Sequence, residues 1–242
     1  MRIVPLVFLL TMGALVWVGC KDEDAPTDLS TSMTADDAAD AIASALGGSQ
    51  ATSGLTAQLE EGASVAGGGT LGKVDGTSGV LFDTTVTRQR TGTYSFSYTF
   101  QFSWNLVNIN QFTFAYAMHG VYDTPRMSSD DSATATFQVS NLLTGSTYLA
   151  SGIYNRYGTQ ASKVRNKVSF RSTFTFSTTD LQIDKATRRI TSGTGTVTFY
   201  GQTSTGNIFS YTGTVVFMGN QSATLTMSGT TYTLNLALGQ AG

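Results

Sequence analysis

The chain offers few side chains that could carry chemistry by themselves. It contains a single histidine, His119, and a single cysteine, Cys20. A Ser-His-Asp triad could be built only around His119, which falls on the polar side of a strand expected over 112–118. We interpret His119 as a half-exposed strand residue. The sequence therefore predicts no enzyme active site, no zinc site and no cofactor.

A second group of reactive side chains is cationic and regularly spaced. Val164 to Phe176 is expected to form one strand whose cations share one parity, with apolar residues on the other. Such a basic stripe could bind an anionic surface glycan or a lipid headgroup. It could equally protect an exposed strand from edge-to-edge pairing, and both interpretations stay open. The stripe consists of Lys163, Arg165, Lys167 and Arg171.

Three carboxylates lie close together in the sequence near Pro125. Asp123, Asp130 and Asp131 supply hard oxygen atoms of the kind that Ca²⁺ prefers. The spacing of a calcium-binding loop is not present, so we expect an ordinary solvated loop and no metal site.

The N-terminus has the pattern of an export signal. Arg2 precedes an apolar stretch from Ile3 to Val18, which is short for a membrane-spanning helix. The stretch ends in Trp17-Val18-Gly19-Cys20, which resembles the lipobox of bacterial lipoproteins. That resemblance implies that residues 1–19 are a signal peptide and that Cys20 becomes the acylated N-terminus, anchored in a membrane.

The residues after the cysteine have the pattern of a sorting signal. Lys21-Asp22-Glu23-Asp24 resembles the export signal of Bacteroidota lipoproteins. The resemblance implies an outer-membrane lipoprotein displayed at the cell surface, while the alternative is a plain solvated tether. The whole chain is similar to Bacteroidota surface lipoproteins of unassigned function. The resemblance brings no catalytic residues with it.

Charge is sparse and unevenly distributed. Charged residues make up 12% of the chain and the net charge is −2. Residues 20–61 hold nine acidic side chains against one lysine, whereas residues 62–242 hold seven acidic against twelve basic side chains. The positive charge of the second part is too weak and too dispersed to indicate a nucleic-acid partner.

Residues 20–69 are expected to form an acidic tether with short helices. Thr34 precedes Asp37 by three residues, as in a capping box, and Ala35 to Leu46 is rich in strong helix formers. A second helical candidate covers Leu55 to Glu61. Because the apolar stripe is narrow, we expect weak helices that rest on the body or fray, in preference to a docking helix for a partner.

Residues 70–242 are expected to form one antiparallel β domain. Apolar and polar side chains alternate from Tyr94 to Leu106, which is typical of a strand. Short turns leave no room for helical crossovers, so neighbouring strands should pair as hairpins. Nine or ten strands joined in this way predict an all-β fold, either an up-and-down barrel or an elongated β-sandwich. A membrane-embedded barrel is disfavoured because such a barrel needs no acyl anchor.

These observations favour a non-catalytic lipoprotein of the outer membrane and cell surface. We expect it to bind either an apolar molecule in a cavity or a glycan on the sheet. The alternative is a structural or accessory envelope protein that packs against a partner. The alternation does not distinguish an aromatic cavity from a filled core, because both need apolar residues on one face.

Overall fold

The fold is one long meander of strands wrapped around two helices. The computed structural model describes residues 32–47, 54–67 and 81–242. Eleven strands lie in one sheet in the order in which they occur in the chain, and each pairs antiparallel with the next. The elements are α1 Ala35–Leu46, α2 Leu55–Gly67, β1 Leu81–Arg90, β2 Ser95–Asn108, β3 Gln111–Asp123, β4 Met127–Ser140, β5 Thr147–Ser162, β6 Ser169–Asp184, β7 Ile190–Thr203, β8 Ile208–Gly219, β9 Ser222–Met227, β10 Thr230–Asn235 and β11 Gln240–Ala241.

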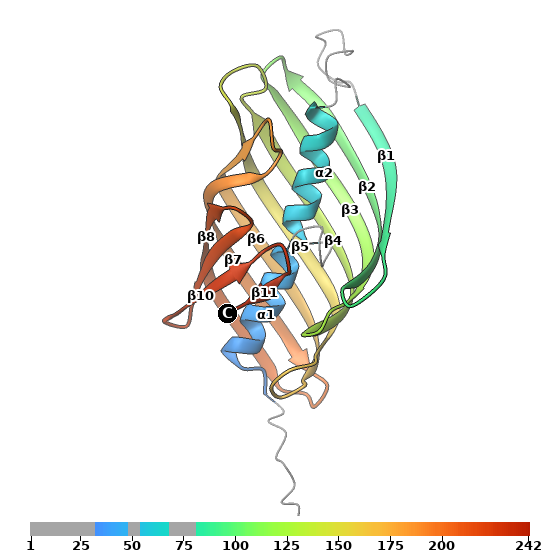
Figure 1. Ribbon diagram of the computed structural model, residues 1–242, viewed down its shortest axis with the longest axis vertical. Coiled ribbons are helices and arrows are strands. Elements are labelled where there is room, and N and C mark those ends of the chain that lie inside the picture. The colour runs from blue at the N-terminus through green and yellow to red at the C-terminus, as the bar shows by residue number, and fades with distance from the viewer. Residues whose placement is uncertain (1–31, 48–53, 68–80) are drawn as a thin grey trace, which may run out of the picture.

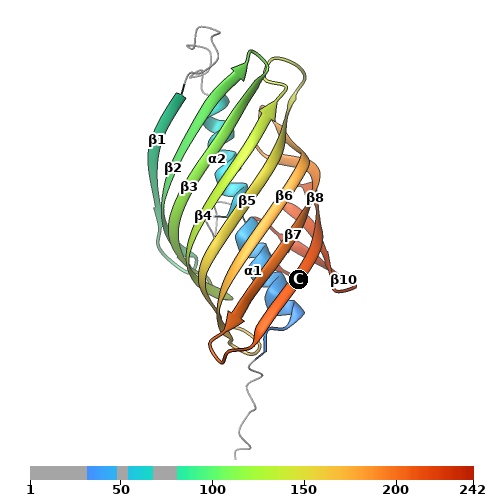
Figure 2. The same ribbon diagram turned by 180° about the vertical axis from the view of Figure 1, so that it is seen from behind.

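The predicted all-β class with hairpin connections is confirmed. The sheet is not closed, because within the described residues β1 and β11 form its two edges. Figure 1 shows that the sheet curls into a trough, with α1 and α2 running along its concave side. The opposite view in Figure 2 shows the convex side, which the helices do not cover. We call these two sides the inner face and the outer face.

Alternation along each strand divides the side chains between the two faces. On β3, Phe112, Phe114, Tyr116 and Met118 are buried against the helices, as their parity predicts. His119 lies on the outer face with 64% of its side chain exposed, which confirms its predicted position on the polar side. The Ser- and Thr-rich residues of the other parity likewise form the outer face.

Inward-facing glycines help the sheet to curl. A side chain at Gly152, Gly195 or Gly201 would collide with a phenylalanine ring on the neighbouring strand. These rings are Phe137, Phe176 and Phe209 respectively. Glycine lets an aromatic ring cover the backbone of the next strand, and glycines of this kind allow strong curvature in designed sheets. The resulting trough is deep enough to hold a helix.

Helix α1 has the predicted bounds and the predicted cap. The backbone N–H of Asp37 donates to the Thr34 hydroxyl at 3.2 Å. Of the two alternatives expected, a helix that rests on the β-body or one that frays, the structure shows the first, and the helix is buried more deeply than expected because Ile42 and Leu46 are completely buried. Most of the alanines of α1 belong to the same hydrophobic core as the aromatic rings of the sheet. The helix therefore forms part of the core despite its narrow apolar stripe.

An ionic contact fixes α1 in the trough. The Asp40 carboxylate accepts hydrogen bonds from Arg126 at 2.9 Å and from Arg165 at 2.5 Å. It also accepts one from the backbone N–H of Ala241 at 3.1 Å. Arg126 and Arg165 lie in the β3–β4 and β5–β6 connections. We call Asp40 and these two arginines the helix clasp.

Candidate functional site

The predicted basic stripe does not exist as a strand face. Residues 163–168 connect β5 to β6, so the strand begins five residues later than predicted. Arg165 and Lys167 each have a φ of 50°, which no extended strand allows. Lys163 forms an ion pair with Asp123, and Arg165 belongs to the helix clasp. Of the four cations, Arg171 alone lies on a strand.

The expected acidic loop is also wrong. Asp130 and Asp131 both lie on β4, where they point to opposite faces of the sheet. Asp130 is exposed on the outer face, 2.8 Å from the imidazole Nε2 of His119. Asp131 is buried on the inner face, where it pairs with Arg156 of β5. Charged residues flanked by serines suggested a loop, but Arg156 supplies the partner that lets Asp131 be buried.

A buried network of polar side chains lies on the inner face of the sheet. Arg156 Nε donates to the Asp131 carboxylate at 2.7 Å, while Gln160 and Ser129 also donate to Asp131. Ser172 donates to Gln160 at 2.7 Å. Burial, the largest single influence, acts to lower the pKa of the Arg156 guanidinium, but the Asp131 carboxylate together with Tyr154 and Tyr122 raises that pKa above its ordinary value. The network ties β4, β5 and β6 together.

The inner face is filled by the helices. In the described part of the chain, an enclosed space between α2 and the sheet has a volume of about 20 Å³, and Leu59, Phe114 and Tyr148 are among its lining residues. A space of this size holds roughly one water molecule. We therefore looked for a ligand site on the outer face.

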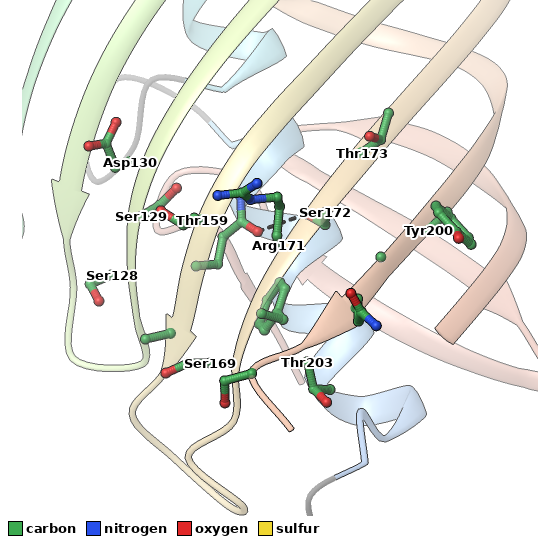
Figure 3. Close-up of a pocket in the computed structure, with 16 residues that line it drawn as sticks. Ser128, Ser129, Asp130, Thr159, Ser169, Arg171, Ser172, Thr173, Tyr200 and Thr203 are labelled. Atoms are coloured by element: carbon green, nitrogen blue, oxygen red, sulfur yellow. Dashed lines mark hydrogen bonds between the residues drawn. The ribbon is translucent and has the colours of Figure 1, made fainter. Parts of the chain in front are cut away.

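The outer face carries a groove near the ends of β4 to β7. Its volume is about 840 Å³, within the range of small-molecule sites. Figure 3 shows Arg171 and Tyr200 on neighbouring strands within it, with the Arg171 side chain extending over β5. We call it the first groove. Its lining residues are Ser128, Ser129, Asp130, Thr159, Gln160, Ala161, Ser169, Phe170, Arg171, Ser172, Thr173, Tyr200, Gly201, Gln202, Thr203 and Ser204.

Strand register sets the spacing of Arg171 and Tyr200, which line the groove, and of Tyr157, which lies outside its lining residues. Thr173 lies between Tyr157 and Tyr200 in one cross-strand row. The two tyrosines are thus two strand spacings apart, about 9.6 Å. In the next row, Arg171 lies between Thr159 and Gln202. Tyr157 is 57% and Tyr200 is 51% exposed, so both rings are available to a ligand.

Arg171 is the principal charged group of this groove. It is exposed, and within the part of the chain that the structure describes its guanidinium makes neither a hydrogen bond nor an ion pair. The acidic group of the groove, Asp130, already contacts His119. A free guanidinium offers five N–H donors in a planar fork that matches a carboxylate. The groove can therefore bind an anionic group at Arg171 and also offers the aromatic ring of Tyr200.

Sequence reasoning missed the two tyrosines. Both stand at outward positions of strands whose other outward residues are mostly Ser, Thr and Asn. An aromatic residue on the polar parity was the available signal. The predicted anchor residues, Cys20 and Lys21 to Asp24, lie outside the described residues.

Two further properties concern membranes and metals. Among residues 32–47, 54–67 and 81–242, neither helix has the length and hydrophobicity needed to cross a bilayer. In the same residues, His, Asp and Glu side chains do not gather in threes as a metal ion would require.

No protein-family model matches the chain, and searches of curated proteins and of solved structures likewise find no match.

Proposed function

We propose that this protein is a lipid-anchored protein of the bacterial outer surface that binds an acidic glycan in the first groove. The observation that carries the proposal is the unpaired, exposed guanidinium of Arg171 in a groove that also presents the exposed ring of Tyr200. A sugar ring has an apolar C–H face that can lie against an aromatic ring, and hydroxyl groups that can pair with polar side chains. The Ser, Thr and Gln residues of the groove supply such partners.

The choice of an acidic sugar follows from the charges. Asp130 is held by His119, whereas Arg171 has no partner among the described residues. A sugar carboxylate would give Arg171 a charge-assisted pair of hydrogen bonds, which are the strongest that a side chain forms. The apolar ligand expected as an alternative has less support, because α1 and α2 fill the inner face. The ligand is therefore assigned to the outer face.

A pair of polymers with one backbone tests this proposal. Purified protein is titrated with polygalacturonate and with its uncharged methyl ester by isothermal titration calorimetry. We expect the acidic polymer to bind more tightly. Arg171→Gln should weaken its binding by about ten-fold or more, as loss of a charged hydrogen bond implies. Tyr200→Ala should weaken binding of both polymers.

Arg189→Gln is the matched control, because it removes the same charge from an exposed arginine outside the groove. Its affinity should equal that of the unchanged protein. Absence of binding to both polymers, or binding that survives both groove substitutions, would overturn the proposal.

The anchor is tested separately. The proposal requires the mature chain to begin at an acylated Cys20 and to face outward. Cys20→Ser should move the protein from the membrane fraction to the soluble fraction. Protease added to intact cells should digest the unchanged protein, and protection until the outer membrane is broken would contradict surface display.

A structural or accessory role in the envelope is the second candidate function. It is favoured by the filled trough and by apolar side chains at the end of the sheet away from the helix clasp. Ile109 and Leu143 are each 67% exposed there. The β4–β5 loop that carries Leu143 is held by three hydrogen bonds from Lys185. Covalent crosslinking at Leu143 in cells would reveal a stable protein partner if this candidate is correct.

A further inference from the structure

A second groove lies on the outer face over the same strands. Its volume is about 730 Å³, and it spans β4 to β8. Its lining residues include Gln138, Ile153, Ser177, Thr194, Thr196 and Thr214. Ile153 is half-exposed and supplies an apolar surface, while the other five supply hydroxyl or amide groups. Among the residues that line it, none is charged.

The two grooves follow one line along the strands. Arg171 marks the first groove on β6 and Ser177 marks the second, about 20 Å away at about 3.3 Å per residue. On β6 itself the outward residues between them, Thr173 and Thr175, are small and polar, and Tyr157 and Tyr200 flank Thr173 on the neighbouring strands. Thr175 donates to Asn155 at 2.9 Å, and Thr198 is the neighbour of Thr175 on β7. The path along β6 from one groove to the other therefore passes between the rings of Tyr157 and Tyr200.

We propose that the second groove is a further subsite for the same glycan, so that the protein binds an extended chain and not a single sugar. The inference rests on the proposed function of the first groove. A sugar unit with a carboxylate would pair with Arg171, and units further along the chain would lie over Ile153 and the threonines. Binding at both subsites adds contacts without a second encounter, so affinity rises with ligand length.

Oligogalacturonates of two to eight units test this inference, with dissociation constants measured by calorimetry. For the unchanged protein, the longest oligomer should bind at least ten-fold more tightly than the shortest. Thr196→Trp fills the second groove from an exposed strand position, where a large aromatic residue is compatible with the sheet. It should lower the affinity for the longest oligomer to that for the shortest and leave the shortest unaffected.

Thr212→Trp is the control, because Thr212 is exposed on β8 and lines neither groove. It should bind every oligomer as the unchanged protein does. Equal affinity for all lengths, or a Thr196→Trp variant that retains the length dependence, would overturn the second subsite and leave the first groove standing. Failure of every length to bind would overturn the proposed function together with this inference.

Discussion

The Asp40 carboxylate accepts a hydrogen bond from the backbone N–H of Ala241 at 3.1 Å, which joins the first helix to the last strand. Ala241 is buried and Asp40 has only 3% of its side chain exposed. The same carboxylate forms ion pairs with Arg126 and Arg165. One side chain therefore holds two loops and one sheet edge against α1.

Asp40→Asn removes the charge at the centre of the helix clasp. Arg126 then loses its charged partner, and Arg165 keeps only the more distant carboxylates of Asp36 and Asp37. Breaking a buried ion pair from one side is strongly destabilising. We expect the free energy of unfolding in urea to fall by about 3 kcal/mol. Asp36→Asn is the control, because Asp36 is 58% exposed and lies 3.9 Å from Arg165. Equal losses in the two variants would show that Asp40 has no special role.

The buried pair of Asp131 and Arg156 should show strong coupling. Arg156→Met leaves a buried carboxylate without its cation, at a cost of roughly 3–5 kcal/mol. Adding Asp131→Asn removes that carboxylate's charge, so the double variant should be more stable than Arg156→Met alone. Urea unfolding of the four proteins gives the coupling energy. Additive losses would mean that the two side chains do not stabilise one another.

Tyr116→Phe tests a buried hydroxyl. The hydroxyl has no hydrogen-bond partner among the described residues, so its removal at pH 7 should leave stability unchanged or raise it by up to about 1 kcal/mol. Tyr211→Phe is the matched control and should lose about 1 kcal/mol, because the Tyr211 hydroxyl donates to the Met33 carbonyl at 2.8 Å.

The same variant should change the response to alkali. Burial raises the pKa of Tyr116 well above its ordinary value of 10.0. The folded protein thus holds this proton more tightly than the unfolded chain, and the corresponding stability is lost as pH rises above 10. Above pH 10 the stability of Tyr116→Phe should therefore fall less steeply with pH than that of the unchanged protein. Identical alkaline profiles followed by circular dichroism would contradict this.

The charged carboxylate of Glu60 on α2 should lower the stability of the folded protein near neutral pH. Burial raises the pKa of its carboxyl above 4.5, while Arg189 lowers it to a lesser extent. A carboxyl whose pKa is higher in the folded protein than in the unfolded chain stabilises the fold at pH values below the unfolded pKa. This stabilisation is lost as the pH rises through the folded pKa. Glu60→Gln should therefore have a higher urea midpoint than the unchanged protein at pH 7. The difference should shrink as pH falls through the raised folded pKa and should vanish below 4.5, and a difference independent of pH would point to packing instead.

The fold followed from local patterns more readily than the site did. Alternation along β3 and the cap at Thr34 are properties of neighbouring residues, so sequence reasoning found them. The burial of α1 depends on rings that lie far along the chain, and the apolar content of the helix itself gives no sign of it. The prediction of a basic stripe on a strand was wrong because Lys163, Arg165 and Lys167 occupy alternate positions in a loop just as they would in a strand. In that loop Lys163 pairs with Asp123 of β3, and Arg165 pairs with Asp40 of α1.

The contact between Asp40 and Ala241 spans 201 positions of the chain, and this separation bears on the order of folding. Hairpins such as β3–β4 join neighbouring segments and form quickly, whereas contacts between distant segments form slowly. We expect the sheet to grow hairpin by hairpin and α1 to settle in the trough only when β11 has been made. The first helix of the described residues is thus the last element to reach its final position.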